Sequence, residues 1–351
     1  MRTFRPIWIT TWIMAVAAGL AACAPESDDM ASETSAEPAV AAPTPGPAPA
    51  TVSVTQPSSE PAPVAPAMPD VITAQRGGFI PEGVEYDRAN RRFLTGSLAE
   101  GSIFEIGLDG SVTPVVTDPE LVSSVGIEVD EARDRLLVAN SDRAVFGGQS
   151  RGQAKLGVYS LTTGERLAMV DLGAELDAGD EAAFFANDVA VADDGTAFIT
   201  DTQRNVVYRV GGDYEPSVHY AFSGVDGMTL NGIEWHPDGY LVIADSGNGR
   251  FYKLPTASGS DADMIAVPEA LPGADGIVWR DDGALAVVQN SPSDGRVVLL
   301  ISDDGWLTAS IAGAAAHSGQ ATTGAAVGNE IFAVQPHFAD PEPPSIRRAE
   351  F

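Results

Sequence analysis

Cysteine is almost absent from this sequence, and basic residues are scarce. Cys23 is the single cysteine, which excludes an intramolecular disulfide. The chain has 20 Lys and Arg against 49 Asp and Glu, so its formal net charge is −29 at pH 7. A chain this acidic offers no basic patch that could neutralise phosphates, and we therefore expect no nucleic-acid partner. The acidity is typical of a soluble, self-repelling surface, and it is also compatible with cation binding.

Several common catalytic motifs are missing as well. The sequence contains no Gly-Lys-Ser phosphate loop, no Gly-x-Ser-x-Gly nucleophile elbow and no cysteine placed to act as a nucleophile. The spacing of the four histidines, His219, His236, His317 and His337, does not indicate a ligand cluster. A zinc enzyme is therefore disfavoured, because zinc sites normally need histidine or cysteine ligands.

The N-terminal residues have the pattern of a bacterial lipoprotein signal peptide. Arg2 and Arg5 supply positive charge, and Ile7–Leu20 is an apolar segment too short and too interrupted by threonine for a secure membrane span. Leu-Ala-Ala before Cys23 fits a lipobox, in which the cysteine is acylated; the alternative is an ordinary signal peptide with an incidental cysteine. We expect a signal peptide at residues 1–22 and an exported protein, lipid-anchored at the periplasmic face of a membrane. Ala24 stands where an Asp would favour inner-membrane retention, so the outer membrane is favoured.

Residues 23–69 follow the signal peptide and contain almost no large apolar side chains. They are dominated by Ala, Pro, Ser, Thr and Glu, so they cannot bury enough surface to offset the cost of ordering the backbone. We expect the lipidated Cys23 to be followed by a disordered Ala/Pro-rich tether, with a folded domain over residues 70–351.

The folded domain consists of six similar segments. Each has one distinctive residue, then a short apolar strand, a turn and a second buried strand. The turns are often Asp-Gly or Asn-Gly, which are typical of hairpins. A repeat of about 40–50 residues, once a Gly/Gln-rich insertion around Val145–Lys155 is set aside, predicts an all-β, six-bladed β-propeller of four-stranded blades. The six distinctive positions are Glu82, Val125, Asn187, Asn231, Asp275 and Thr323.

The sixth segment has only two obvious strands, so the ring must close by sharing strands between the chain ends. Val71–Ala74 and Ser345–Phe351 are the segments available to complete that blade. An unclosed set of meanders would leave exposed strand edges, which folded proteins avoid.

The six distinctive positions are expected to converge. In a propeller the first strand of each blade lies along the central channel, so side chains at its leading end meet at one mouth. Two acids and two amides among them offer oxygen ligands without sulfur or imidazole, a set that suits Ca²⁺ and is compatible with other divalent cations. Asn-Gly, Asp-Gly and Glu-Gly are also common turn dipeptides, so each of these residues, considered alone, is also explained by a structural role in a turn.

With these motifs the chain resembles the gluconolactonase/regucalcin-like (senescence marker protein) family of six-bladed propellers, and more distantly diisopropylfluorophosphatase and paraoxonase. The resemblance covers about Phe79–Phe338 and rests on Glu82 in PEGVEYD, Asn187 in FFANDVAV, Asn231 in LNGIEWHPDG and Asp275 in ADGIVWRDDG. It implies that Glu82, Asn231 and Asp275 bind a divalent cation directly and that Asn187 binds metal or substrate. It further implies that Asp275 is the catalytic base or nucleophile.

The sequence departs from this family beside the third motif. Sugar-lactone hydrolases of the family usually carry an Arg where this chain has Phe185, and Phe184, Met228 and Leu230 also flank the distinctive positions. We therefore predict a hydrophobic lactone or ester substrate contacted by Phe185, Asn187 and Met228; the alternative is that these apolar side chains form a core under the loops. His317 is a further candidate for a substrate contact or proton shuttle.

One more acidic set recurs at an equivalent strand position, comprising Glu85, Glu128 and Glu234. Hydrogen bonding between blades is the interpretation we prefer, with a second cation site as the alternative.

Together these features predict an exported, lipid-anchored, Ca²⁺-dependent hydrolase of a small-molecule lactone or ester, with metal at the channel mouth. The main alternative is a non-catalytic propeller that binds a protein or ligand at the cell envelope, because propellers host both classes. A quinone-dependent sugar dehydrogenase on the same fold is a weaker alternative, since the sequence lacks a convincing His and Arg pairing.

Overall fold

The computed structural model describes residues 68–176, 179, 182–317, 319–338 and 342–351. The chain divides into two units, residues 1–64 and 65–351, and the second unit contains all the described residues. The predicted signal peptide, the lipidated Cys23 and most of the predicted tether lie outside the described residues. In the described part of the chain no helix has the length and apolar character needed to span a membrane.

The described residues form six antiparallel blades, whose strands are as follows. Blade 1 contains β2 (Val84–Asp87), β3 (Arg92–Thr95), β4 (Ile103–Ile106) and β5 (Val112–Val116). Blade 2 contains β6 (Ser123–Asp130), β7 (Arg135–Ser141), β9 (Lys155–Ser160) and β10 (Arg166–Asp171). Blade 3 contains β11 (Phe184–Val191), β12 (Ala197–Asp201), β13 (Val206–Val210) and β14 (Pro216–Ala221), with β8 (Gly152–Gln153) added beside β11.

The remaining blades repeat the same order. Blade 4 contains β15 (Leu230–His236), β16 (Tyr240–Asp245), β17 (Arg250–Pro255) and β18 (Asp263–Ile265). Blade 5 contains β19 (Ala274–Trp279), β20 (Leu285–Gln289), β21 (Arg296–Ile301) and β22 (Ser310–Ala316). Blade 6 contains β23 (Gly324–Val327), β24 (Glu330–Gln335), β25 (Ser345–Arg348) and β1 (Val71–Thr73). The described loops also contain three short 3₁₀ helices, η1 (Glu131–Arg133), η2 (Arg143–Gly147) and η3 (Gly173–Glu175).

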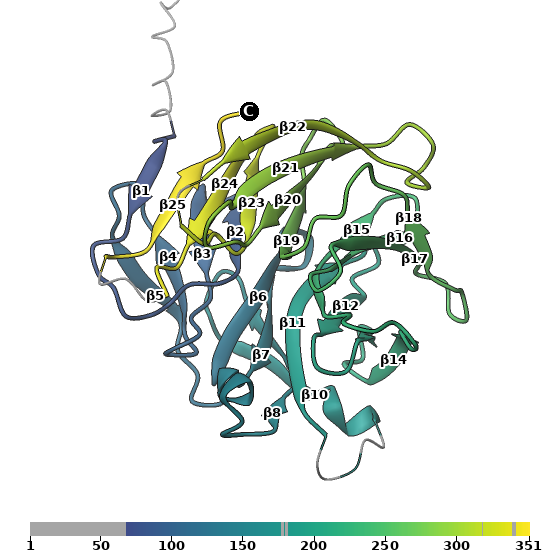
Figure 1. Ribbon diagram of the computed structural model, residues 1–351. Helices are drawn as coiled ribbons and strands as arrows, with labels where there is room; N and C mark the ends of the chain where they lie inside the picture. The colour runs from purple at the N-terminus through teal and green to yellow at the C-terminus, as the bar shows by residue number, and fades with distance from the viewer. Residues whose placement is uncertain (1–67, 177–178, 180–181, 318, 339–341) are drawn as a thin grey trace, which may run out of the picture. The chain divides into compact units, whose positions relative to one another are not determined.

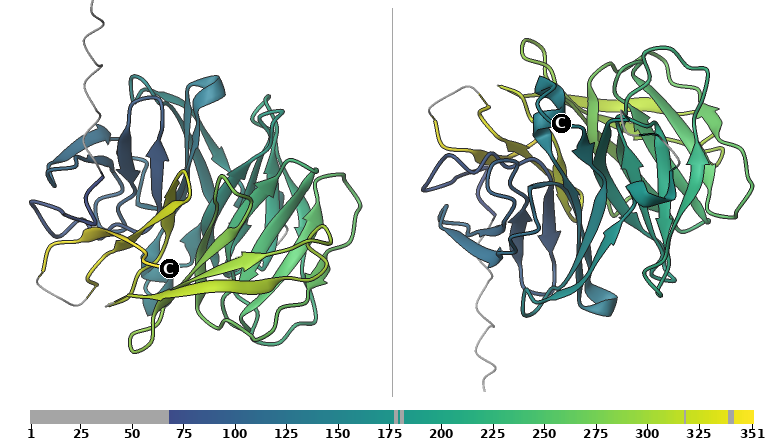
Figure 2. Two further views of the ribbon diagram at one scale, coloured as in Figure 1. Left: turned by 90° about the horizontal axis from the view of Figure 1, so that it is seen from above. Right: turned by 90° about the horizontal axis from the view of Figure 1, so that it is seen from below.

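The first strands of the blades form a closed circle of neighbours. β2 contacts β6, β6 contacts β11, and the contacts continue through β15, β19 and β23 back to β2. The blades are accordingly arranged around a common axis, as Figures 1 and 2 show. The predicted six-bladed propeller with four-stranded blades is confirmed.

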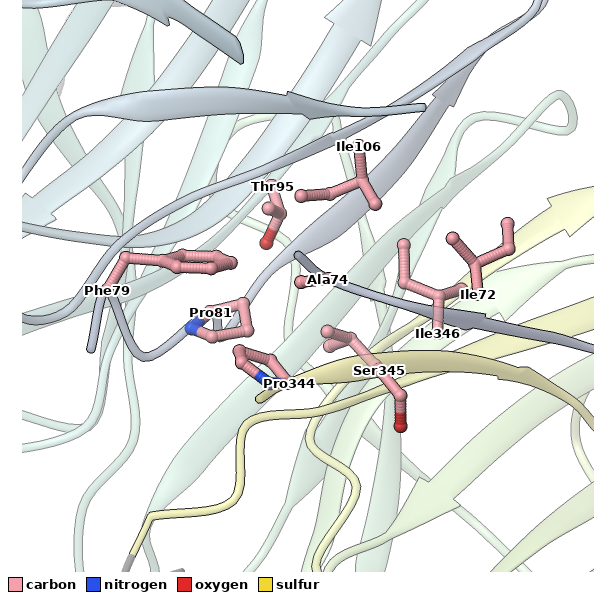
Figure 3. Close-up of a pocket in the computed structure, with 10 residues that line it drawn as sticks. Ile72, Ala74, Phe79, Pro81, Thr95, Ile106, Pro344, Ser345 and Ile346 are labelled. Atoms are coloured by element: carbon pink, nitrogen blue, oxygen red, sulfur yellow. The ribbon is translucent and has the colours of Figure 1, made fainter. Parts of the chain in front are cut away.

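Both ends of the domain complete the sixth blade. β1 pairs antiparallel with β25, with Ile72 opposite Ile346, and the purple β1 lies beside the yellow β25 in Figure 1. This confirms closure by the two predicted segments. Figure 3 shows Ile72, Ile346 and Phe79 among the apolar residues that gather at this seam. The cavity left between them is only about 10 Å³, so the seam is closely packed.

Each pair of neighbouring blades encloses an apolar core of its own. Leu136 and Val138 of β7 pack towards blade 1, whereas Leu137 and Ala139 pack towards blade 3. Successive side chains of a strand point to opposite faces, so a central strand that is apolar throughout serves two cores. Six such clusters fill the six interfaces of the ring.

One insertion lies over the channel mouth. It joins β7 to β9 in blade 2 and contains η2 and β8. β8 pairs in parallel with the start of β11, with Gly152 opposite Phe184 and Gln153 opposite Phe185. The pairing holds the insertion against blade 3, next to Asn187.

Candidate functional site

A β-bulge lies at the leading end of the first strand in four consecutive blades. The pairing register shifts between Ser124 and Ile127 in blade 2, and equivalent shifts occur at Ala186/Val189, Leu230/Ile233 and Ala274/Ile277. The predicted positions Val125, Asn187, Asn231 and Asp275 therefore all fall inside bulges. An extra residue in a strand re-aims the local side chain, which is how bulges are often used beside functional sites.

These side chains meet at one cavity. It has a volume of about 400 Å³ and contains all four of the predicted metal-binding residues, together with Phe185. Glu82, Asn187 and Asp275 are each less than a tenth exposed. The described residues that line it are Glu82, Leu98, Val125, Arg143, Phe146, Phe185, Asn187, Asn231, Asp275, Asn290, Thr322 and Phe338.

The sixth blade contributes a threonine one position earlier than expected. Thr322, not Thr323, lines the cavity. The Gly276 N–H donates to the Thr322 carbonyl, just as the Gly83 N–H donates to the Val125 carbonyl between blades 1 and 2. The first strand of blade 6, β23, begins only at Gly324. The sequence alignment of the six segments therefore assigned the distinctive position of blade 6 to the residue directly after the one that lines the cavity.

Two residues that sequence reasoning missed support the predicted ligands. Nδ2 of Asn290 donates to Oδ2 of Asp275 at 2.8 Å, and Nδ2 of Asn187 donates to Oγ1 of Thr202 at 2.8 Å. Asn290 follows the second strand of blade 5, and Thr202 follows the second strand of blade 3. A polar residue directly after the second strand is thus the repeated sequence signal that could have identified both.

The acids at the mouth are unfavourably placed for negative charge. Burial raises the pKa of Glu82 well above its ordinary value, and the nearby carboxylates of Asp275 and Asp188 raise it further. Burial also raises the pKa of Asp275 to about 7, although hydrogen bonds from Asn290 and Asn231 oppose the shift. Carboxyls in such surroundings must either bind protons or be neutralised by a cation.

Asp188 was not among the predicted site residues, yet it links blades 3 and 4 beside the channel mouth. It accepts hydrogen bonds from the backbone N–H groups of Val189 and, across the blade boundary, Ile233. Burial raises the pKa of Asp188 to about 7 despite these hydrogen bonds. The Asn-Asp pair of blade 3 therefore directs one side chain to the cavity and uses the other to join blades 3 and 4.

The second predicted acidic set lies within mutual electrostatic reach. Burial raises the pKa of Glu85 to about 8, and it raises the pKa of Glu128 strongly with further contributions from Glu85 and Glu234. Glu234 accepts a hydrogen bond from the backbone of Trp279 in the next blade, in agreement with the interblade role that we preferred.

Within the described residues, no group of three or more His, Cys, Asp or Glu is arranged to hold a metal ion on its own. A cation at the mouth would therefore use amide oxygens in addition to carboxylates. The cavity offers that combination in Glu82, Asp275, Asn187 and Asn231.

Two predicted substrate contacts lie elsewhere. Met228 belongs to the apolar core between blades 3 and 4, where it packs with Leu230. His317 follows β22, the outermost strand of blade 5, and its Nδ1 lies 3.0 Å from the Gly319 carbonyl oxygen. Neither Met228 nor His317 is among the described residues that line the cavity.

Comparison with known proteins places this architecture in a family. Regucalcin from Agrobacterium tumefaciens, described as a calcium-binding protein, is similar with a TM-score of 0.56 and 15% identity, over 81% of this chain and 94% of that one. A gluconolactonase from Xanthomonas campestris is similar with a TM-score of 0.55 and 19% identity, over 79% and 89% of the two chains. Virginiamycin B lyase from Staphylococcus aureus is similar with a TM-score of 0.54 and 10% identity, over 79% and 83%.

At these identities the structural similarities show the fold alone. No curated protein matches the chain. The sequence profile of the SMP-30/Gluconolactonase/LRE-like region, however, matches residues 80–330, which is most of the propeller. The chain therefore belongs to the SMP-30/gluconolactonase/LRE-like family of six-bladed propellers.

Proposed function

We propose that this protein is a Ca²⁺-dependent hydrolase of a lactone or ester, with its reaction centre at the channel mouth. One observation carries the proposal: two buried carboxylates, Glu82 and Asp275, line a single cavity with the amides of Asn187 and Asn231. Among the described residues neither carboxylate has an ion-pair partner, so a divalent cation is the natural means of neutralising them. Membership of a gluconolactonase-like family supports a lactonase-type hydrolase at the family level.

The donor set fits a hard cation. Glu82, Asn231 and Asp275 would hold it directly, and Asn187 would bind either the cation or the substrate. Because Nδ2 of Asn187 donates to Thr202, its carbonyl oxygen remains available as a ligand. When bound, Ca²⁺ or another divalent cation would polarise the substrate carbonyl and stabilise the negative charge that develops on its oxygen.

Asp275 is the residue placed to move the proton. Asn290 holds Oδ2, and without a cation burial raises the pKa of Asp275 to about 7. The positive charge of a bound cation would lower this pKa, so the carboxylate would be deprotonated and able to accept a proton at neutral pH. In hydrolysis Asp275 takes a proton from water as the water oxygen bonds to the acyl carbon. The acyl C–O bond then breaks and the leaving oxygen is protonated, giving a hydroxy acid or an acid and an alcohol. Direct attack by Asp275 on the acyl carbon is the nucleophilic alternative.

The decisive variant is Asp275→Asn. The amide keeps one oxygen for a cation but cannot accept the proton, so kcat/KM should fall by about 10²-fold to 10⁴-fold. The matched control is Asp303→Asn, an exposed residue of the same blade that is outside the cavity lining. The assay is hydrolysis of a panel of lactones, aryl esters and phosphotriesters with and without added Ca²⁺. Full activity in Asp275→Asn, or no activity on the panel with any divalent metal, would contradict the proposal.

A second candidate function is ligand or partner binding without catalysis. The observation in its favour is that Phe146 and Phe338 are 62% and 42% exposed at the cavity, as aromatic contacts of a binding surface are. The hydrolysis panel separates the two functions.

We also propose that the protein is exported and anchored by lipid at Cys23, on the periplasmic face and preferably of the outer membrane. The lipobox before Cys23 supports this placement. When the protein is expressed in bacteria, Cys23→Ser should abolish its labelling with palmitate. Absence of labelling in the wild type would contradict the proposed lipid anchor.

A further inference from the structure

The insertion of blade 2 supplies one wall of the cavity. Arg143 and Phe146, both in η2, line it beside residues from all six blades. Asp142 caps η2 by accepting a hydrogen bond from the Ala144 N–H at 2.9 Å, and Phe146 packs edge-on against Phe185 with ring centroids 4.7 Å apart. The contact between Phe146 and Phe185 and the pairing of β8 with β11 both hold the insertion against blade 3, so its side chains are positioned by the fold.

Arg143 is the only basic residue among the described residues that line the cavity. Several other arginines of this acidic chain form ion pairs: Arg76 contacts Glu100, and Arg166 contacts both Asp118 and Glu120. The Arg143 guanidinium has no ion pair or hydrogen bond to any described residue, although its backbone N–H donates to Ser123. Its five N–H donors are therefore free to bind a ligand.

The cavity combines three kinds of surface. Oxygen ligands from Glu82 and Asp275 suit a cation, and Phe146, Phe185 and Phe338 offer apolar contacts. Arg143 adds a planar positive group, which matches a carboxylate through two parallel hydrogen bonds better than it matches any neutral group. A neutral substrate would leave the positive charge of the guanidinium uncompensated, whereas a carboxylate would neutralise it.

We propose that Arg143 binds a carboxylate on the substrate, so that the site selects lactones or esters that carry an anionic group on an apolar body. This inference rests on the proposed hydrolase for its role in selection. The binding of a carboxylate by Arg143 can nevertheless be measured without turnover. In this arrangement Arg143 is a specificity-determining residue, and the reacting carbonyl lies towards Asp275.

Hydrolysis tests the selection. The substrates are 4-acetoxybenzoate and phenyl acetate, which differ by one carboxylate, with the wild type, Arg143→Gln and Arg209→Gln. Arg209 lies in β13 at the end of blade 3 remote from the mouth, so it controls for the loss of one positive charge. Arg143→Gln should lower the ratio of kcat/KM between the anionic and the neutral ester roughly tenfold. Arg209→Gln should leave the ratio unchanged. An unchanged ratio in Arg143→Gln overturns the inference.

Equilibrium binding separates this inference from the proposed function. Calcium-loaded wild type should bind 4-hydroxybenzoate more tightly than 4-hydroxybenzamide, and added salt and Arg143→Gln should each remove the difference. Such binding without hydrolysis of either ester would refute the hydrolase and leave the role of Arg143 standing. Failure to bind 4-hydroxybenzoate, or equal binding by Arg143→Gln, would refute the role of Arg143 even in an active enzyme. A melting temperature equal to that of the wild type shows that the variant is folded.

Discussion

At the channel mouth, burial and hydrogen bonding have opposite effects on the protonation of Asp275. Burial favours the protonated form of Asp275, whereas hydrogen bonds from Asn290 and Asn231 favour the charged form. Asn290 is therefore a positioning residue that tunes the base as well as orienting it. Thr202 holds Asn187 in the same way but does not contact Asp275.

Asn290→Ala should raise the pKa of Asp275, because it removes a hydrogen bond that stabilises the carboxylate. The acidic limb of the pH profile of kcat/KM should then move to higher pH, with a lower rate at neutral pH. Thr202→Val is the comparison, since it should weaken binding at Asn187 and leave that limb in place. If the limb stays put in Asn290→Ala, Asp275 is not the titrating base.

In blades 2 to 5, the bulge is the element that aims a side chain at the mouth. In blades 1, 2, 4 and 5 the backbone of the neighbouring blade lies so close that the residue following the distinctive position must be glycine. A Cβ on Gly232 would lie 2.5 Å from the Asp275 carbonyl oxygen, and a Cβ on Gly83 would lie 2.5 Å from the Val125 carbonyl oxygen. The Asn-Gly and Glu-Gly motifs thus reflect packing between blades as much as turn formation.

Gly232→Ala should therefore damage both the fold and the site. The added methyl group meets backbone atoms that cannot rotate away, so we expect a loss of about 1–3 kcal/mol of stability and weaker activity as Asp275 is displaced. Gly212→Ala is a matched control, because a Cβ there meets nothing within 4 Å and the backbone needs no positive φ. Thermal melting and kcat/KM of both variants provide the test; equal behaviour would contradict the packing argument.

For the whole molecule, the ring is the unit of stability. Each blade shares a core with two neighbours, and β1 and β25 join the two ends of the domain in blade 6. Removing residues 345–351 should lower the melting temperature far more than removing residues 350–351, because only the longer deletion takes β25 out of the ring. Similar melting temperatures for the two truncations would show that β25 is dispensable for closure.

The acids enclosed by the ring also couple its stability to pH. In the folded state the pKa of Glu85 rises from 4.5 to about 8 and that of Asp188 rises from 3.8 to about 7, so the folded form holds protons that the unfolded form has lost. Stability without metal should be greatest near the unfolded pKa values and decline as pH rises towards about 8. Arg88 opposes the shift at Glu85, while Asp130, Glu234 and Glu85 reinforce the shift at Glu128.

Melting temperatures in a chelator should accordingly be higher at about pH 5 than at about pH 8, and Glu128→Gln should flatten the difference. Calcium should oppose the decline, since it would bind the deprotonated carboxylates of Glu82 and Asp275 in the folded ring. At a hundredfold excess over its dissociation constant it would add roughly 2.7 kcal/mol. The proposed coupling would be contradicted by a melting temperature that rises with pH in chelator, or by one that calcium does not change at any pH.

Much of this could be predicted from the sequence, because the signals are local and repeated. Hairpin dipeptides and apolar runs recur with the period of a blade, which was sufficient to predict six blades, the closing segments and the convergence of Glu82, Asn187, Asn231 and Asp275. Side-chain partners were harder to predict. The supporting roles of Asn290 and Thr202 depend on which strand ends lie next to each other in the folded blade. The repeated sequence pattern alone does not specify these neighbours.

The sequence by itself determined the fold and the oxygen-rich character of the mouth, because each repeat contains its own turns, its own strands and one distinctive residue. Only the tertiary structure decided which neighbours surround those residues. It placed Thr322 rather than Thr323 at the cavity, kept Met228 in a core, and brought Arg143 to the same cavity as Asp275 across more than a hundred residues of chain. These outcomes depend on strand register and on contacts between blades, and both are set by packing between segments that lie far apart in the sequence.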